Sequence, residues 1–278
     1  MITPNKVQQH FNNHATRASN QVLNDEMGQR LLQRLQLINI NPDYILDIGC
    51  GDGRLTANLK QQFPKATLIG LDASEATLRQ TRPKRQLWRA PQYESICTDA
   101  CQLPIASESC QLVTANLLLP FCSDLTALLS EIQRVLTVEG VFIFNSLGPD
   151  SFEPLKQFWP HDYQNVFQNA LVDMHDLGDE LVRAQMTDPV MDVQELTIEY
   201  SQLLKAVKEM YWWGASPHLL TDRTTSWRAI YRELRQAYPQ GVDVQLELVN
   251  GHAWKPQQTF NTQTGEVNVS IESLRSKR

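Results

Sequence analysis

A glycine-rich turn is the strongest chemical signal in the sequence. It follows an apolar run and reads Asp47-Ile48-Gly49-Cys50-Gly51-Asp52-Gly53. Glycines permit a tight turn with positive φ and let a ligand lie against the main chain. The spacing does not fit the dinucleotide fingerprint G-x-G-x-x-G, because Arg54 stands where its third glycine would be. A carboxylate at this place, that of Asp47, suits a ligand with a positive ammonium group better than a pyrophosphate.

Three more polar side chains each follow a later predicted strand. Asp72 comes 25 residues after Asp47, where α/β nucleotide sites place the carboxylate that accepts the ribose hydroxyls. An alternative role for Asp72 is to cap the next helix, which Ser74 could do as well. Asp99 and Asn116 follow the third and fourth predicted strands. Because parallel strands end at one edge of a sheet, we expect these side chains to converge on one ligand.

Short apolar strands that alternate with amphipathic helices must position these side chains. We expect strands over residues 44–48, 66–71, 94–98, 111–115, 141–145, 190–200 and 242–249. We expect helices over residues 22–38, 54–63, 74–82, 125–136, 176–185, 202–213 and 226–238, a turn over 136–140, and a peripheral hairpin in the polar tail from Gln257. This alternation predicts an α/β fold with a parallel sheet that helices cover on both faces.

Composition narrows the class of protein. The 278 residues carry 25 Lys and Arg against 31 Asp and Glu, and this balance argues against broad binding of nucleic acid or anionic membranes. No apolar run approaches the roughly 20 residues that span a bilayer, and the polar N-terminus does not resemble a secretory signal. The five cysteines form no CxxC pair, which favours reduced thiols in a cytoplasmic protein without a bound metal. We expect one domain over residues 1–256, with lid and substrate insertions at about 151–172 and 201–238, and a polar extension over 257–278.

Together these motifs resemble those of the class I S-adenosylmethionine-dependent methyltransferases. The resemblance covers residues 45–145 and rests on the glycine-rich turn, Asp72, the segment 99–104, Asn116 and the turn at 136–140. It implies a Rossmann-like fold with a mostly parallel seven-stranded sheet, a helical lid, S-adenosylmethionine (SAM) as cofactor and S-adenosylhomocysteine as product. The cofactor-binding residues that it implies are Asp47, Gly49, Cys50 and Gly51 for the methionine part, Asp72 for the ribose, Asp99 with Ala100 for the adenine, and also Ala73 and Asn116.

A narrower resemblance extends through the second half of the chain. The segments 144–155, 173–184, 188–192, 214–216 and 251–256 are similar to those of the biotin-pathway malonyl-acyl-carrier-protein O-methyltransferases, the BioC family. This resemblance implies methyl transfer to the free carboxylate of a malonyl thioester on acyl carrier protein. A carboxylate is already ionised at pH 7, so such an enzyme needs no general base. It must hold the carboxylate in line with the sulfonium methyl and exclude water.

The resemblance also points to groups that could hold the substrate and its carrier. Lys208 stands six residues before Gly214, where family members commonly have Arg, and Tyr211 lies close to it. The alternative for Lys208 is a solvated lysine on a helix face. Four arginines could form a basic surface for an acidic carrier, although a solvated helix face is the commoner explanation: Arg223, Arg228, Arg232 and Arg235.

Departures from the family pattern leave alternatives open. Ala18 and Ser19 stand where relatives have an aromatic–acidic pair, which His10, His14 and Arg17 could replace, and Leu119-Pro120-Phe121 stands where relatives have Gln-Trp. Two other functions are therefore considered, an arginine hydroxylase resembling a respiratory complex I assembly factor and a non-catalytic SAM-binding scaffold. His175 could be read as a metal ligand, but a helix-start cap with a packed histidine is the better interpretation.

Overall fold

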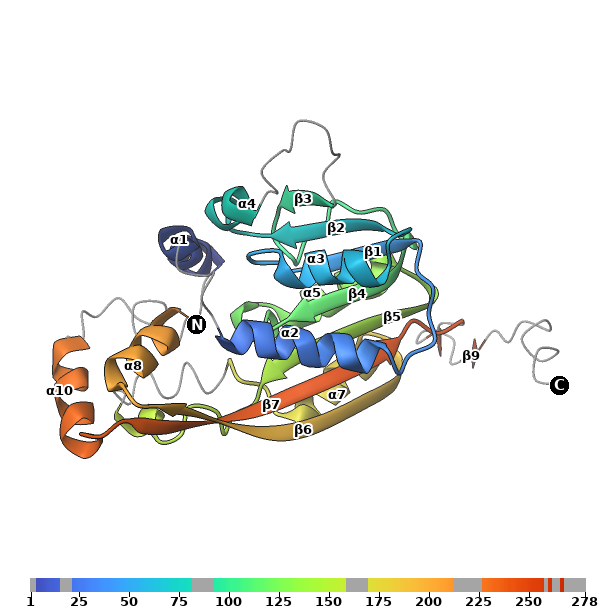
Figure 1. Ribbon diagram of the computed structural model, residues 1–278. Coiled ribbons are helices and arrows are strands. Elements are labelled where there is room, and N and C mark those ends of the chain that lie inside the picture. Colours follow the sequence, from blue (N-terminus) through green and yellow to red (C-terminus); the bar gives the residue numbers. More distant parts are fainter. Residues whose placement is uncertain are drawn as a thin grey trace.

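The computed structural model describes residues 4–15, 22–81, 93–158, 170–212, 227–257, 260–261 and 266–267. Its main feature is a seven-stranded sheet with the strand order β3-β2-β1-β4-β5-β7-β6 (Figure 1). The strands are β1 (Tyr44–Ile48), β2 (Thr67–Asp72), β3 (Glu94–Cys97), β4 (Cys110–Asn116), β5 (Leu136–Leu147), β6 (Thr187–Tyr200) and β7 (Val242–Trp254). Six strands of this sheet run in the same direction, and β7 runs antiparallel to them. The prediction of a mostly parallel seven-stranded sheet is confirmed.

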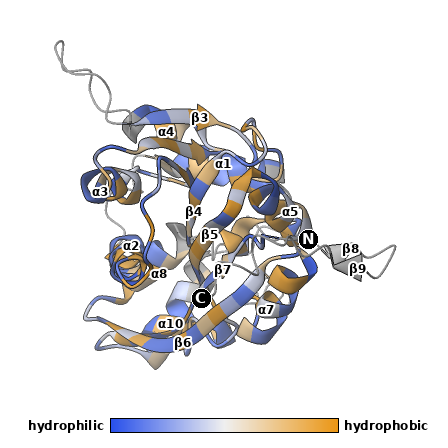
Figure 2. Cartoon of the chain, turned by 90° about the vertical axis from the view of Figure 1, so that its right-hand side faces the viewer, coloured by the Kyte–Doolittle hydropathy of each residue, from blue (hydrophilic) through white to orange (hydrophobic). Residues whose placement is uncertain are grey.

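Helices cover both faces of the sheet. The described helices are α1 (Pro4–His14), α2 (Val22–Leu35), α3 (Arg54–Gln62), α4 (Glu75–Thr81), α5 (Leu125–Val135), α7 (Met174–Arg183), α8 (Leu203–Trp212) and α10 (Trp227–Ala237), with short 3-10 turns η2 (Leu119–Phe121) and η3 (Leu155–Phe158). Figure 2 shows α2 and α3 on one side of β4 and β5, and α5 and α7 on the other. The short strands β8 (Phe260–Asn261) and β9 (Glu266–Val267) pair as the hairpin expected in the tail. None of the helices in the described ranges is long and apolar enough to cross a membrane.

Alternating side chains along the strands build the two cores of this sandwich. Ile45 and Leu112 pack with residues of α2 and α3, whereas Leu46 and Val113 pack with residues of α5 and α7. Successive strand residues point to opposite faces, and burial of each aliphatic side chain contributes about 1.5–3 kcal/mol, so a shift of one residue would be strongly unfavourable. This fixed register brings the carboxyl ends of the parallel strands to one edge.

The fifth strand begins earlier than the sequence suggests. Residues 136–140 were expected to form a turn, but β5 begins at Leu136, which pairs with Cys110 before a shift in register. The main chain of this segment bonds to residues far away in sequence, because Glu139 N–H donates to Lys255 O and Lys255 N–H donates to Gly140 O. Local sequence carries no sign of such long-range pairing. For the same reason β7 continues to Trp254, beyond the expected end at Val249.

The strands β6 and β7 form a ribbon that extends beyond the rest of the sheet. Residues 248–254 of β7 pair with β5, whereas residues 242–247 pair with β6 and, at Gln245, form an isolated bridge with Glu153. Helices α8 and α10 lie at the protruding end of this ribbon (Figure 1). A third core forms there from side chains such as Leu203, Val207, Leu234 and Val244. The predicted insertion at 201–238 maps to this region, of which residues 213–226 lie outside the described part, as do residues 159–169 of the first insertion.

Candidate active site

A cavity lies at the edge of the sheet where β1, β2, β3 and β4 end. Polar groups line the cavity beside the glycine-rich turn. Apolar side chains such as Leu23, Leu147 and Phe152 line other parts of its wall. Seven of the residues predicted to bind the cofactor line this cavity, namely Gly49, Gly51, Asp72, Ala73, Asp99, Ala100 and Asn116. Three of the four polar groups expected after successive strands, Asp72, Asp99 and Asn116, therefore meet at this cavity, whereas the fourth, Asp47, does not line it.

The glycine-rich turn passes close to other parts of the wall. Gly49 has a φ of 69°, and a Cβ at this position would lie 2.9 Å from Leu118 Cδ1. Gly51, with a φ of 54°, donates its N–H to Asp72 Oδ2 at 3.0 Å. A side chain at Gly49 would strain the backbone and intrude on Leu118, so the turn keeps its shape only with glycine there.

Asp72 is held at the cavity by two main-chain donors. Its Oδ1 accepts Ser74 N–H at 2.7 Å, and its Oδ2 accepts Gly51 N–H. Ser74 Oγ accepts Thr77 N–H at 3.2 Å, so Ser74 caps α4 and Asp72 does not. Burial raises the pKa of Asp72, while both N–H groups oppose that shift. Each carboxylate oxygen keeps a further lone pair, which gives Asp72 the capacity to accept two ligand hydroxyls.

Asp47 and Cys50 do not line the cavity. The Asp47 side chain is 1% exposed and accepts hydrogen bonds from Thr56 Oγ1 at 2.5 Å and Thr114 Oγ1 at 2.8 Å. Burial raises the pKa of Asp47 from its ordinary value of 3.8 to about 6, although the two hydroxyls oppose this effect. The Cys50 thiol packs against Gly70. Of the residues predicted for the methionine part, only the glycines are placed to touch a ligand.

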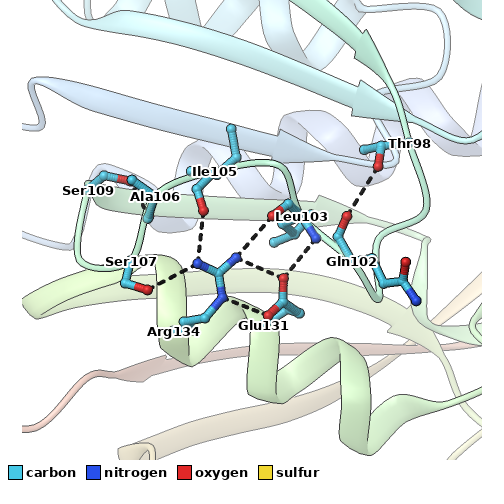
Figure 3. Close-up of polar contacts among 9 residues, drawn as sticks. All are labelled: Thr98, Gln102, Leu103, Ile105, Ala106, Ser107, Ser109, Glu131 and Arg134. Carbon is cyan, nitrogen blue, oxygen red and sulfur yellow. Dashed lines mark hydrogen bonds and ion pairs between the residues drawn. The ribbon is translucent and has the colours of Figure 1, made fainter.

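The loop that carries Asp99 and Ala100 is held by an arginine on α5 (Figure 3). Arg134 donates to Leu103 O at 3.0 Å, to Ile105 O at 2.9 Å and to Ser107 Oγ. Glu131 accepts Leu103 N–H at 2.8 Å and pairs with Arg134. Charge-assisted bonds of this kind are stronger than neutral ones. Arg134 thus holds the loop in place from helix α5. The sequence analysis did not predict this function.

Arg134→Gln should therefore weaken ligand binding without removing any group from the cavity wall. Glutamine can replace one or two of these bonds, so we expect a loss of about 1–3 kcal/mol in the free energy of unfolding. We expect the affinity for the cofactor to fall by roughly threefold to thirtyfold, because the loop with Asp99 must be ordered on binding. Urea unfolding and calorimetric titration measure the two effects. Arg79→Gln, which removes an exposed pair with Glu75, is the matched control and should change neither.

Asn116 contributes an unpaired oxygen to the site. Its Nδ2 donates to Asn24 O at 3.1 Å, whereas its buried Oδ1 has no hydrogen-bond partner within the described residues. Asn145 fixes the neighbouring main chain, since its Oδ1 accepts Leu117 N–H at 2.9 Å. A buried acceptor without a donor costs about 1–3 kcal/mol. A ligand that brings an ammonium or hydroxyl donor to Asn116 would offset this cost.

Helix α1 covers one side of the cavity, near α4 (Figure 1). Gln8 donates to Ala73 O at 2.8 Å, Asn12 Oδ1 accepts Ser74 Oγ–H at 2.8 Å, and Phe11 packs edge-on against Phe121. Phe11 lines the cavity together with Val7. Neither was predicted as a site residue, although their spacing of four residues is typical of an apolar helix face. His10 is buried beside Phe11, while the His14 side chain and residues 17–19 lie outside the described part.

Three of the residues predicted for substrate and carrier, Lys208, Arg232 and Arg235, are not among the residues that line the described cavity. Lys208 is exposed on α8, and Arg232 and Arg235 are exposed on α10. These two helices contact each other. Tyr211 lies in α8 and Arg228 in α10, but their side chains, and all of Arg223, fall outside the described part. The functions assigned to these six residues stay predictions.

The predicted cap at the start of α7 is confirmed in part. Asp173 accepts His175 N–H at 2.7 Å and caps the helix. The expectation of a packed histidine is wrong, because the His175 side chain is 82% exposed beyond this cap. Among the described residues, no group of three or more His, Cys, Asp and Glu side chains could hold a metal ion.

Comparisons with known proteins agree with this geometry. A family model described as a methyltransferase domain matches residues 46–144. The malonyl-[acyl-carrier protein] O-methyltransferase of Legionella pneumophila is 36% identical in an alignment that covers all of both chains. That of Nitrosospira multiformis is 34% identical over 90% of this chain and 88% of its own. The chain belongs to the malonyl-[acyl-carrier protein] O-methyltransferase family.

Membership of this family makes the protein a methyltransferase that uses SAM, as the sequence resemblance implied. A putative methyltransferase from Bacillus halodurans shares the fold, with a TM-score of 0.58 at 17% identity over 82% of this chain and all of its own. The residues present also fit SAM. The turn at Gly49 and Gly51 leaves the main chain accessible, Asp72 can accept two hydroxyls, and the orphaned Asn116 oxygen can accept a donor. The relatives indicate neither an arginine hydroxylase nor a scaffold.

Proposed function

We propose that this protein transfers the methyl group of SAM to the free carboxylate of a malonyl thioester on acyl carrier protein, in the cytoplasm and as a step of biotin synthesis. The observation that carries the proposal is the relationship over the full chain to enzymes named for this reaction. The cavity supports it, because polar groups suited to SAM share one wall with the apolar side chains of Leu147, Phe152 and Leu171.

The chain's own residues act by binding and orienting the reactants. Asp72 would accept the ribose hydroxyls of SAM, Asp99 with Ala100 would border the adenine, and the unpaired Asn116 oxygen would accept a donor. SAM, when bound, supplies an electrophilic methyl group on a sulfonium. A malonyl carboxylate is ionised at pH 7, so no side chain has to remove a proton. Orientation of the carboxylate toward the methyl group can contribute about 7–11 kcal/mol of the barrier reduction.

Exclusion of water is the second task of the protein. Apolar side chains from several elements, among them Leu23, Leu147 and Phe152, would replace water around the acceptor carboxylate. A carboxylate that loses part of its hydration reacts more readily with an electrophile. Phe11 and Phe121 pack against each other where α1 meets η2, and this contact closes part of the wall.

Helices α8 and α10 would bind the carrier. Their exposed Lys208, Arg232 and Arg235 place positive charge on these two helices, although the whole chain carries a net charge of −6. Complementary charge accelerates encounter and fixes register between partners. An acidic carrier would therefore approach by this end, with its thioester directed toward the cavity.

The decisive experiment measures the mass of the carrier after incubation with the protein and SAM. Malonyl-acyl carrier protein should gain one methyl group, and acetyl-acyl carrier protein, which has no free carboxyl, should gain none. Malonyl-coenzyme A tests whether the carrier is needed. Binding of SAM by calorimetry without any methyl gain on the malonyl carrier would contradict the proposed acceptor.

Lys208→Ala provides a residue-level test of the acceptor side. If Lys208 pairs with the substrate carboxylate or the carrier, kcat/KM for the malonyl carrier should fall about tenfold, the usual size of one charge-assisted contact, while the affinity for SAM stays unchanged. Lys208→Arg should retain the activity. Lys205→Ala on the same helix is the matched control, because Lys205 is also exposed. Equal kcat/KM in Lys208→Ala and wild type would remove Lys208 from the site.

A further inference from the structure

Two cysteines that are far apart in sequence meet on the cavity wall. Cys101 Sγ and Cys122 Sγ lie 3.4 Å apart, and both residues line the cavity. Cys101 belongs to the loop after β3, and Cys122 follows η2. Both thiols face the carbonyl oxygen of Asp124, at 3.6 Å from Cys101 and 3.3 Å from Cys122. The shared acceptor keeps the two sulfur atoms on the same side of the wall.

The arrangement is close to that needed for a covalent bond. A disulfide has an S–S distance of about 2.05 Å, so the sulfur atoms would have to approach by roughly 1.4 Å. Both cysteines lie in irregular segments between regular elements, where a shift of this size breaks no strand or helix. Cys50 and Cys110 are buried in the core and meet no second thiol, and Cys97 is exposed with its thiol toward Ala73 O.

The two thiols also differ in reactivity. The contact between the two sulfur atoms, in which either thiol can donate, lowers the pKa of Cys122 and raises that of Cys101. The thiolate is the form that attacks a disulfide. Cys122 is thus the attacking residue, and Cys101 is placed to resolve the mixed disulfide that results.

We propose that Cys101 and Cys122 form a dithiol modification site, which low-molecular-weight disulfides such as oxidised glutathione convert to a protein disulfide that weakens SAM binding. The Cys122 thiolate attacks one sulfur of the glutathione disulfide and releases one glutathione. The Cys101 thiolate then attacks Cys122 Sγ and releases the second. Two electrons pass from the protein to the oxidant, and the two thiol protons leave on the two glutathione molecules.

The effect on SAM follows from where the bond would form, and it rests on the proposed cofactor site. The bond would draw the loop with Asp99 and Ala100 toward Phe121 on the opposite segment, and so narrow the part of the cavity assigned to the adenine. Binding and oxidation are then coupled in both directions. Bound SAM should protect the two thiols from oxidation by the same factor by which oxidation lowers the affinity for SAM.

The first measurement is the formation of the bond in the full-length protein. After incubation with oxidised glutathione and alkylation of free thiols, digestion with endoproteinases Glu-C and Asp-N separates residues 95–98, 99–108 and 109–123. We expect a disulfide between fragment 99–108, which contains Cys101, and fragment 109–123. Cys122→Ser should abolish this link, and Cys97→Ser should leave it intact. Free alkylated Cys101 and Cys122 after incubation with excess oxidant would overturn the proposal.

The second measurement is SAM affinity by calorimetry in reduced and oxidised protein. We expect the oxidised protein to bind SAM roughly tenfold more weakly or worse, within the usual range of coupling between sites, and dithiothreitol to restore binding. In Cys122→Ser, the affinity for SAM should be the same before and after treatment with oxidised glutathione. Equal affinity in the two wild-type forms would overturn the effect on SAM. Weak SAM binding by the reduced protein would instead contradict the proposed cofactor site, while the mapped disulfide would still report on the thiols.

Discussion

Asp72→Ala should lower the affinity for SAM by about two to four orders of magnitude. The carboxylate can accept two ribose hydroxyls, and each charge-assisted bond contributes about 1.5–3 kcal/mol, where 1.4 kcal/mol corresponds to a factor of ten. Part of the effect will be local, because Gly51 N–H and Ser74 N–H lose their acceptor and the glycine-rich turn loosens. Calorimetric titration with SAM measures the loss.

Asp179→Ala is the matched control for this substitution, since Asp179 is an exposed aspartate on α7 that is remote from the cavity wall. It should bind SAM as the wild type does. Asp72→Asn keeps the size of the side chain but presents an amide donor to one of the two N–H groups, so it should also bind weakly. If Asp72→Ala binds SAM within threefold of the wild type, the ribose assignment is incorrect.

Asp47→Asn should make the protein more stable at neutral pH and less able to bind SAM. Burial raises the pKa of Asp47 to about 6, so the folded state favours the protonated carboxyl. The contribution of this group to stability is therefore full below pH 4 and is lost as pH rises to about 6. The shift from 3.8 corresponds to about 3 kcal/mol of destabilisation above pH 6. Asparagine avoids this cost, because its amide can accept from one threonine hydroxyl and donate to the other.

Urea unfolding at pH 4 and pH 8 tests this expectation. The free energy of unfolding of Asp47→Asn should match that of the wild type at pH 4 and exceed it at pH 8, whereas Asp43→Asn, an exposed change just before β1, should follow the wild type at both. If the free energies of unfolding of Asp47→Asn and of the wild type change equally between pH 4 and pH 8, Asp47 carries no buried charge. The weaker SAM binding is expected because the cofactor's ammonium group would lose a negative charge behind the turn, and calorimetry measures it.

The cofactor side could be predicted from the sequence because its geometry follows from local rules. A strand, a glycine-rich turn and a helix in succession place Gly49 and Gly51 at the sheet edge, and each further polar residue at a strand end joins them there. Asp72 and Asn116 line the cavity for this reason. Their positions depend only on the strands that precede them and on the register of those strands, which the apolar side chains specify.

Other parts depend on contacts that spacing does not encode. Arg134 holds the loop of Asp99 from a helix about thirty residues further along the chain, and this pairing looks like an ordinary charged helix surface in sequence. The cysteines are a second example. Cys101 meets Cys122, which lies 21 residues further along the chain, and nothing in the spacing of the five cysteines indicates this contact.

The protruding ribbon of β6 and β7 divides the molecule into regions of unequal local stability. Residues 242–247 of β7 extend about 20 Å beyond the last pairing with β5, and a two-stranded ribbon of this kind is barely stable by itself. Packing of α8 and α10 around Leu203 and Leu234, together with the bridge between Glu153 and Gln245, therefore stabilises it. Amide hydrogens at this end should exchange with solvent through local opening well before those of β1 and β4. Substitutions that change the preferred methyl acceptor can accumulate at this end without lowering the stability of the half of the protein that carries the glycine-rich turn.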